Sequence, residues 1–107
     1  MNHDIVSLND QNFKLEVTDC EGFVLVDFWA EWCRPCQNLM PHIQQLAKDK
    51  KGEIKVCKFN IDEGTEIPSK YGIQSIPTLI IFQAGKEIAR KVGAISDLSS
   101  WVEAEVG

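Results

Sequence analysis

Residues 26–41 read VDFWAEWCRPCQNLMP, and this stretch decides the fold of the chain. The apolar and aromatic run over residues 23–29 predicts a strand that is buried on both faces, as in a parallel sheet. Apolar residues then recur at helical spacing, which predicts a helix over residues 33–49. Two cysteines, Cys33 and Cys36, therefore stand where a buried strand passes into the first turn of a helix.

The rest of the chain predicts an α/β fold around a mixed sheet. The other expected strands are residues 4–7, 54–60, 78–82 and 87–92, and the other expected helices are residues 9–18, 65–71 and 97–106. Asn9 or Asp10 is expected to cap the first of these helices. Its apolar face would come from Phe13, Leu15 and Val17. The order predicts about five strands, flanked on both faces by about four helices.

Composition limits the classes of function. A chain of 107 residues that is 44% hydrophobic predicts one domain over residues 1–107 with its own core. A net charge of −5 argues against nucleic acid as the main partner and suits a monomer. MNHDIVSLND has no basic region followed by an apolar stretch, which predicts a cytoplasmic protein. No apolar run approaches the ~20 residues of a membrane span.

The place of the two cysteines at the start of a helix favours redox chemistry. The first N–H groups of a helix have no internal partners, and the helix dipole adds positive charge there, so both stabilise a thiolate. Cys33 is therefore the better placed nucleophile. Cys36 lies on the same helical face, and Pro35 fits the first turn because its missing N–H does no harm. Cys33 would attack a disulfide, and Cys36 would then release the product.

A structural cysteine pair and half of a zinc site are the alternatives. A structural zinc site needs four ligands, and the sequence has no second CxxC or CxxH. His3 and His42 stand alone. The sequence therefore predicts no metal site.

Asp27 interrupts the apolar strand. A buried carboxylate costs several kcal/mol unless it is paired or protonated. Asp27 alternates with Val26 and Phe28, so it points to the opposite face. We interpret it as a buried acid with a raised pKa that takes the proton from Cys36, with Lys58 of the neighbouring strand as its partner. The alternative is an aspartate that reaches solvent at the end of the strand.

The cysteine motif and four further stretches resemble the thioredoxin family. The motif is VDFWAEWC-x-P-C, and the other stretches are KFNID at 58–62, KYGI at 70–73, SIPTLIIF at 75–82 and KVGA at 91–94. The resemblance spans nearly the whole chain. It implies the thioredoxin fold and a thiol–disulfide oxidoreductase that reduces disulfides of client proteins. It also implies no bound cofactor, and electrons that come from NADPH through a flavin-containing thioredoxin reductase.

The resemblance assigns roles to residues around the motif. It makes the first cysteine the attacking thiol and the second the resolving one. Asp27 matches the family's buried acid, Lys58 matches its neighbour, and Pro77 matches a cis-proline opposite the cysteines. Ile76 would then offer backbone groups to an extended substrate. A proline that merely opens a strand is the alternative.

A set of apolar positions matches the patch with which the family docks its substrates. These positions are Trp32, Ile61, Ile76, Pro77, Val92, Gly93 and Ala94. An exposed apolar patch suits many partners. Ordinary packing is the alternative for any one of them.

Arg34 and Pro35 lie between the two cysteines, and both are expected to affect the reduction potential of the pair. Arg34 departs from the family, in which glycine is usual. Its positive charge would lower the pKa of Cys33, stabilise the reduced form and make the disulfide more oxidising. Because exposed charges are screened, we expect a shift of about 30 mV or less. The alternative is a solvated surface residue with little effect.

The remaining cysteines, Cys20 and Cys57, are expected to be inert. Cys57 falls in a central strand, where a free cysteine behaves as a small hydrophobe. Cys20 falls in an expected loop, so regulation by oxidation is a lesser alternative.

Two competing functions stay open. An oxidase or isomerase would use the same chemistry in reverse, but such relatives usually carry histidine where Pro35 stands. A binding module would use the apolar patch without turnover.

Overall fold

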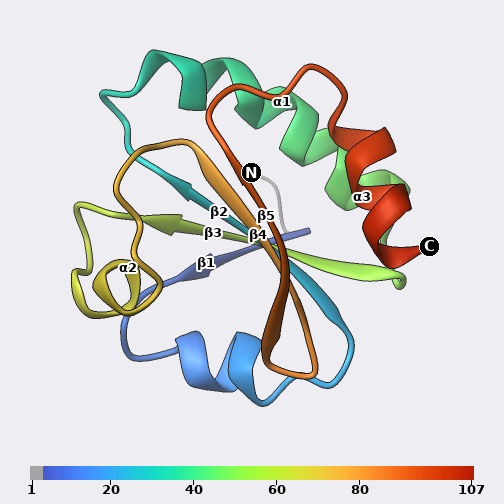
Figure 1. The fold of residues 1–107 in the computed structure, drawn as a ribbon, viewed down its shortest axis with the longest axis horizontal. Helices are drawn as coiled ribbons and strands as arrows, with labels where there is room; N and C mark the ends of the chain where they lie inside the picture. The colour runs from blue at the N-terminus through green and yellow to red at the C-terminus, as the bar shows by residue number, and fades with distance from the viewer. Residues whose placement is uncertain (1–3) are drawn as a thin grey trace.

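The computed structural model describes residues 4–107, which fold around a five-stranded sheet of order β1-β3-β2-β4-β5 (Figure 1). The strands are β1 (Ile5–Leu8), β2 (Phe23–Trp29), β3 (Ile54–Asn60), β4 (Thr78–Gln83) and β5 (Lys86–Val92). β3 runs parallel to both β1 and β2, and β4 runs antiparallel to β2 and β5. The mixed α/β sheet predicted from the sequence is confirmed.

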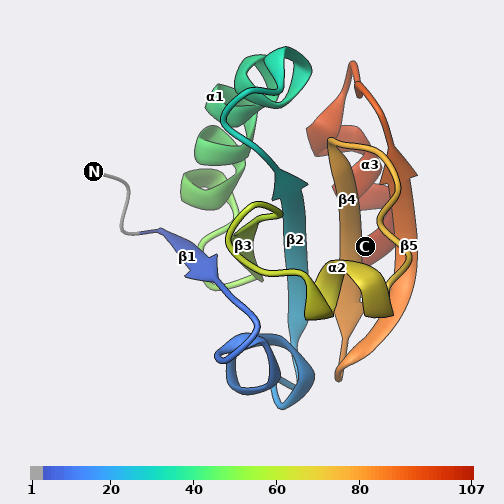
Figure 2. The same ribbon diagram turned by 90° about the vertical axis from the view of Figure 1, so that its left-hand side faces the viewer.

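Helical segments cover both faces of the sheet. They are the π-helical segment η1 (Lys14–Thr18), α1 (Arg34–Asp49), α2 (Glu66–Lys70) and α3 (Leu98–Val106). Side chains of α1 and α3 pack on one face, and side chains of the η1 and α2 regions pack on the other. Figure 2 shows α2 in front of the sheet and α3 behind it. The order of elements agrees with the predicted one.

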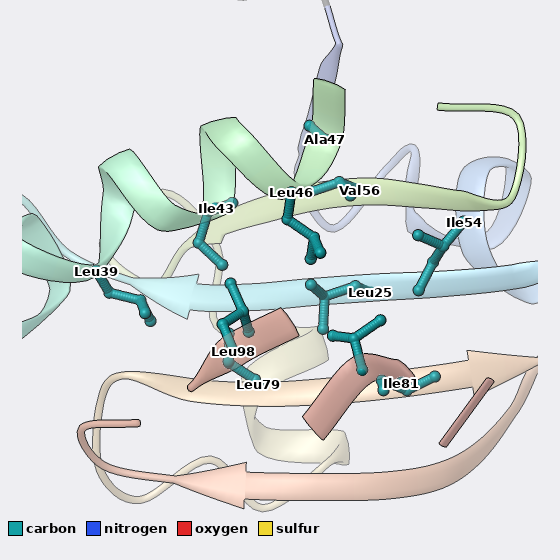
Figure 3. Close-up of a cluster of buried hydrophobic side chains, with 11 residues drawn as sticks. Leu25, Leu39, Ile43, Leu46, Ala47, Ile54, Val56, Leu79, Ile81 and Leu98 are labelled. Carbon is teal, nitrogen blue, oxygen red and sulfur yellow. The ribbon is translucent and has the colours of Figure 1, made fainter. Parts of the chain in front are cut away.

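The core under α1 and α3 is aliphatic (Figure 3). Leu39, Ile43 and Leu46 of α1 face the sheet because they recur every three or four residues. They meet Leu25 of β2 and Leu98 of α3 in one buried cluster. Burial of each such side chain stabilises the fold by about 1.5–3 kcal/mol. This packing fixes the start of α1 at the carboxyl end of β2.

The core on the other face is aromatic. Phe13 and Phe82 lie edge to face with ring centroids 5.8 Å apart, and Tyr71 lies 5.3 Å from Phe82. Phe28 of β2 contacts Phe59 of β3. β2 therefore carries fully buried side chains on both of its faces, as its apolar sequence predicted.

The helix predicted over residues 9–18 is confirmed in its second half, and it ends at Thr18 as expected. Only Lys14–Thr18 is helical, and its hydrogen bonding is of the π type. The side-chain oxygen of Asn9 accepts from the backbone N–H groups of Gln11 at 2.9 Å and Asn12 at 2.8 Å, which is the hydrogen-bond pattern of an N-cap, as predicted for Asn9, although regular helix begins only at Lys14. Leu15 is 68% exposed, which shows that it does not belong to the apolar face.

Asp10 does not cap the segment that follows it. Its carboxylate instead accepts hydrogen bonds from the backbone N–H groups of Thr65 at 3.1 Å, Glu66 at 3.2 Å and Ile67 at 3.0 Å. These groups form the first turn of α2. Asp10 therefore caps a helix that lies more than 50 residues away, as the sequence separations of 55 to 57 show.

The turn between β4 and β5 packs closely against the end of η1. Ala84 and Gly85 have φ values of +51° and +78°, which is the pattern of a tight hairpin turn. A Cβ atom at Gly85 would lie 2.4 Å from the carbonyl oxygen of Thr18. Glycine is needed at this position both for the backbone angle and for the close approach.

Candidate functional site

The two cysteines lie at the N-terminus of α1 and form a disulfide. Cys33 is the N-cap residue, and Cys36 lies in the first turn, with a Cα–Cα distance of 5.2 Å. The backbone N–H of Cys36 donates a hydrogen bond to Cys33 Sγ at 3.2 Å. Cys33 is 5% exposed and Cys36 is fully buried. Cys33 is therefore the cysteine that a partner in solution reaches first, and the helix terminus favours its thiolate.

The residues around the cysteines hold the start of the helix in place. Pro35 lies in the first turn, where the missing N–H costs no hydrogen bond. The side-chain amide of Gln37 donates to the carbonyl oxygen of Glu31. Arg34 is exposed, and its guanidinium makes no hydrogen bond or ion pair with any of residues 4–107.

Asp27 is fully buried in the middle of the sheet. Within the part of the chain that the structure describes, neither of its carboxylate oxygens has a hydrogen-bond partner. Burial raises the pKa of Asp27 from 3.8 to about 7, and the positive charge of Lys58 opposes this rise only in part. The alternative of an aspartate that reaches solvent is therefore excluded.

Lys58 lies beside Asp27 in the sheet. The two residues are paired in the register of β2 and β3, so their side chains share one face. The ammonium of Lys58 lies 5.4 Å from the centroid of the Trp29 ring, which is a cation–π contact. Among the ion pairs of residues 4–107, none joins Lys58 to Asp27. Lys58 thus acts on Asp27 through its charge, and not through a direct bond.

The Ile76–Pro77 segment lies against the redox pair. The Ile76–Pro77 peptide bond is cis, as the family resemblance implied. The carbonyl oxygen of Ile76 lies 3.9 Å from Cys33 Sγ, and the side chains of Ile61 and Ile76 pack against the cysteine cluster. The backbone N–H of Gly93 donates to the carbonyl oxygen of Pro77 at 2.8 Å. The loops after β3, before β4 and after β5 therefore meet at the cysteines.

Two large apolar side chains of the expected patch face solvent. Trp32 is 68% exposed and Val92 is 56% exposed. The indole N–H of Trp32 donates to the carboxylate of Asp62 at 2.9 Å, and the side chain of Asn60 accepts from the N–H of Asp62 at 2.9 Å. Asp62 belongs to the KFNID stretch, but no role was predicted for it. The sequence carries no direct signal for this contact, because the two residues lie 30 positions apart.

The two free cysteines lie away from the redox pair in the sequence and on other elements. Cys57 is fully buried in β3, and burial raises the pKa of its thiol to about 12. Cys20 is half-buried and packs against the aromatic core. The thiol of Cys57 therefore stays protonated at neutral pH.

No metal-binding cluster exists among residues 4–107, because no three or more His, Cys, Asp or Glu side chains are grouped to hold an ion. His42 is exposed on α1, and His3 lies outside the described residues. Over the same range, no helix combines the length and the apolar character needed to cross a membrane.

Comparison with known proteins gives consistent matches. The family model described as Thioredoxin matches residues 4–104. The chain is 44% identical to a thioredoxin of Pseudomonas aeruginosa, over 99% of this chain and 100% of that protein. It is 52% identical to a thioredoxin of Rickettsia bellii, over 81% of this chain and 83% of that protein. It is 45% identical to a thioredoxin of Rhodospirillum rubrum, over 92% and 97% of the two chains.

Proposed function

This chain belongs to the thioredoxin family and is a thiol–disulfide oxidoreductase, and we propose that Cys33 is its attacking thiol and Cys36 its resolving thiol. The observation that carries this assignment is the position of Cys33. It is the N-cap of α1 and the more exposed cysteine, whereas Cys36 is fully buried behind it. A thiolate at the N-terminus of a helix is stabilised by the free N–H groups and the dipole.

The proposed reaction transfers two electrons to the client. The Cys33 thiolate attacks one sulfur of the client disulfide, which breaks that bond and releases one client thiolate. A mixed disulfide then joins Cys33 to the other client sulfur. Cys36 loses its proton, attacks Cys33 Sγ and expels the second client thiolate. The products are the Cys33–Cys36 disulfide and a client dithiol, whose thiolates take up the two protons that the cysteine pair gave up.

Asp27 is proposed to take the proton from Cys36 during the second step. Its pKa of about 7 supports this role, because a group with that pKa accepts and returns protons near neutral pH. Lys58 is proposed to hold this pKa down by its charge. Without the charge of Lys58, the buried carboxyl would keep its proton to higher pH.

The apolar patch around the cysteines is proposed to dock client proteins. Its members are Trp32, Ile61, Ile76, Pro77, Val92, Gly93 and Ala94. The exposure of Trp32 and Val92 supports this proposal, since exposed large apolar side chains around a reactive group are typical of interaction surfaces. The carbonyl of Ile76 beside Cys33 Sγ supports a backbone contact with the client chain.

The family sets the general partners of the chain. Thioredoxins exchange electrons with disulfide-containing proteins and are reduced by thioredoxin reductase, which takes electrons from NADPH through a flavin. We further propose that this chain works as a monomer of one domain in the cytoplasm. The net charge of −5 and one sheet shared by both cores support the first two points.

Trapping experiments test the assignment of the two thiols. In Cys36→Ser, the mixed disulfide with a client has no resolving thiol, so covalent complexes should accumulate and be released by dithiothreitol. Cys33→Ser should give no complexes. Insulin reduction with dithiothreitol should be lost in both variants and kept in Cys57→Ser. A wild-type chain that binds clients without reducing insulin would instead be a binding module.

A further inference from the structure

A groove on the surface runs between α1 and the loop that joins β5 to α3, and it has a volume of about 420 Å³. Its two walls include Pro35, Asn38 and His42 of α1, and Ala94, Ile95 and Ser96 of the loop. A smaller hollow of about 130 Å³ continues from it, because His42 and Ser96 line both. Together they form a path along α1.

One end of this groove opens at the redox pair. Pro35 lies between the two cysteines, and Ala94 is the last residue of the proposed docking patch. A client chain held by its sulfur at Cys33 must continue away from the cysteine in two directions. The groove offers a path for one of them, since it is continuous with the docking patch.

The wall formed by α1 carries polar groups, and Arg34 lies next to Pro35 at its near end, outside the lining itself. Arg34, Asn38 and His42 follow one another at intervals of four residues, so they form an exposed stripe along the helix. α1 has no acidic residue before Asp49. The side chains of Asn38 and Ser96 make no hydrogen bond with any of residues 4–107, so both are available to a ligand.

The acids of this region lie elsewhere. Glu31 precedes Trp32 in the chain, and Asp62 accepts from the indole N–H of Trp32; both acids are exposed, and neither lines the groove. Asp97 lines the far hollow, where its carboxylate already accepts from the N–H and the hydroxyl of Ser100. Arg34 therefore brings one positive charge to the near end of the groove, on a protein with a net charge of −5.

We propose that this groove binds the client segment next to the reacting cysteine, and that it favours a segment with an acidic side chain beside Arg34. The proposal rests on the disulfide-reductase function given above and names its preferred class of client. An exposed ion pair changes binding by about two- to fivefold, so the preference is of that size. Because the pair is exposed, salt reduces it.

Paired peptide substrates test the preference. Two peptide disulfides are compared that differ only in glutamate or glutamine two residues from the cysteine, together with a second pair that carries the change on the other side. The fully reduced protein should show a kcat/KM for one glutamate peptide about two- to fivefold above its glutamine partner, and the ratio should approach one in 0.5 M salt. The ratio cancels any effect of a variant on the reactivity of Cys33 itself.

Three variants decide which residues cause the preference. Arg34→Gly should bring the ratio close to one. Asn38→Glu adds a negative charge to the groove and should bring the ratio of kcat/KM values below one. With two variants that change the charge, the test stays valid if one of them folds poorly. Lys48→Gln makes the same change of charge as Arg34→Gly at the far end of α1, and it should leave the ratio unchanged. The proposal is overturned if the wild-type ratio is one, or if all variants keep it.

Two further readouts separate the groove from the function. The neutral bis(2-hydroxyethyl) disulfide is too small to occupy the groove, so wild type and all three variants should reduce it. No reduction by wild type would overturn the proposed function and the groove with it. A redox-inert peptide, with serine for cysteine, should shift the amide resonances of Asn38, His42 and Ser96 in the oxidised protein. Shifts confined to Trp32 and Ile76 would place the client outside the groove.

Discussion

At the scale of single residues, Asp27 stands out because it is a carboxyl group buried inside the sheet. Its carboxyl group is fully buried without a hydrogen-bond partner, and its pKa is about 7 instead of 3.8. The folded chain therefore holds a proton on Asp27 at pH values where the unfolded chain has lost it. By linkage, this carboxyl contributes stability that is present at low pH and is lost as the pH rises through its folded pKa.

We predict that the free energy of unfolding of the oxidised protein falls by about 2–4 kcal/mol as the pH rises from about 4 to about 7 because of this group. In Asp27→Asn this fall should vanish, so the variant should be the more stable protein at pH 8. Urea unfolding at pH 5 and pH 8 measures both effects. Glu105→Gln, which removes an exposed acid from α3, should keep the wild-type slope. Equal slopes in wild type and Asp27→Asn would contradict the prediction.

The charge of Lys58 should be visible in the titration of Asp27. We predict that Lys58→Met raises the pKa of Asp27 above about 7, because the positive charge that now lowers it is gone. The carboxyl signal of Asp27 in NMR measures the change directly. Lys55→Met is the control, since Lys55 lies in the same strand but pairs with Glu16 at 2.6 Å. An unchanged pKa in Lys58→Met would show that Lys58 does not act on this carboxyl.

Arg34 should have a measurable effect on the reduction potential of the Cys33–Cys36 pair. We predict that Arg34→Gly raises the pKa of Cys33 and makes the reduction potential more negative by about 30 mV or less, because the thiolate loses a nearby positive charge. Exposure of Arg34 keeps the effect small. Equilibration with a dithiothreitol buffer gives the potential of both proteins. If the two potentials agree within error, Arg34 acts only on client binding.

Part of the proposed site can be recognised from the sequence. Cys33, Cys36 and Asp27 stand out because each is unusual for its local context: a cysteine at a helix start, an acid in an apolar strand. Pro77 was assigned only through the family resemblance. The link from Trp32 to Asp62 was not foreseen, because it joins side chains 30 residues apart through a geometry that only the folded loops create. The contact between Lys58 and the ring of Trp29 was hidden for the same reason.

At the scale of elements, the capping of α2 is the feature most open to test. α2 spans only Glu66–Lys70, too short to be stable by itself. Asp10 accepts three hydrogen bonds from its first turn. We predict that Asp10→Ala lowers Tm by roughly 5 °C, as loss of a helix cap does in a small domain. Hydrogen exchange should speed up first at Thr65, Glu66 and Ile67.

Two further variants serve as controls for the predicted effect of Asp10→Ala on Tm. Asp10→Asn keeps an acceptor oxygen and should lie between wild type and Asp10→Ala. Asp19→Ala removes only an exposed ion pair with Lys14 and should have little effect on Tm. Hydrogen bonds from three N–H groups lower the pKa of Asp10, so its contribution should also be lost as the pH falls through that lowered value. A Tm of Asp10→Ala equal to that of wild type would contradict the capping role.

The elements differed in how well the sequence predicted them. The strands at Phe23–Trp29 and Ile54–Asn60 were predicted within their observed bounds, because continuous apolar runs leave few alternatives. The segment after β1 was predicted only in part, because regular helix begins at Lys14 and the sequence does not show that Asp10 serves another helix. Asn9 makes the hydrogen bonds of a cap at the start of its own segment, and Asp10 reaches α2.

At the scale of the whole molecule, the central strands tie both cores together. Leu25 lies in the aliphatic core, and Val24 and Val26 on the same strand lie in the aromatic core. We predict that Leu25→Ala lowers the free energy of unfolding by about 3 kcal/mol. Tryptophan fluorescence and far-UV circular dichroism should shift to the same new midpoint. Leu15→Ala makes the same change at a side chain that is 68% exposed, and it should cost little.

Separate midpoints for the two probes in Leu25→Ala would contradict the proposal of a single domain. The overall architecture was predictable because the order of strands and helices, with short connections, leaves few arrangements of a mixed sheet. The groove beside α1 was not predictable, since it depends on how the β5–α3 loop packs against that helix.

The burial of Cys57 has a consequence for the fidelity of electron transfer. A thiol with a pKa of about 12 is ionised in only roughly one molecule in 10⁵ at pH 7, and its sulfur is closed off from solvent. Since only thiolates exchange with disulfides, Cys57 cannot compete with Cys36 for the mixed disulfide. The chain carries four cysteines, yet burial of Cys57 in the sheet prevents side reactions at this thiol. Electron transfer to the client therefore stays with Cys33 and Cys36.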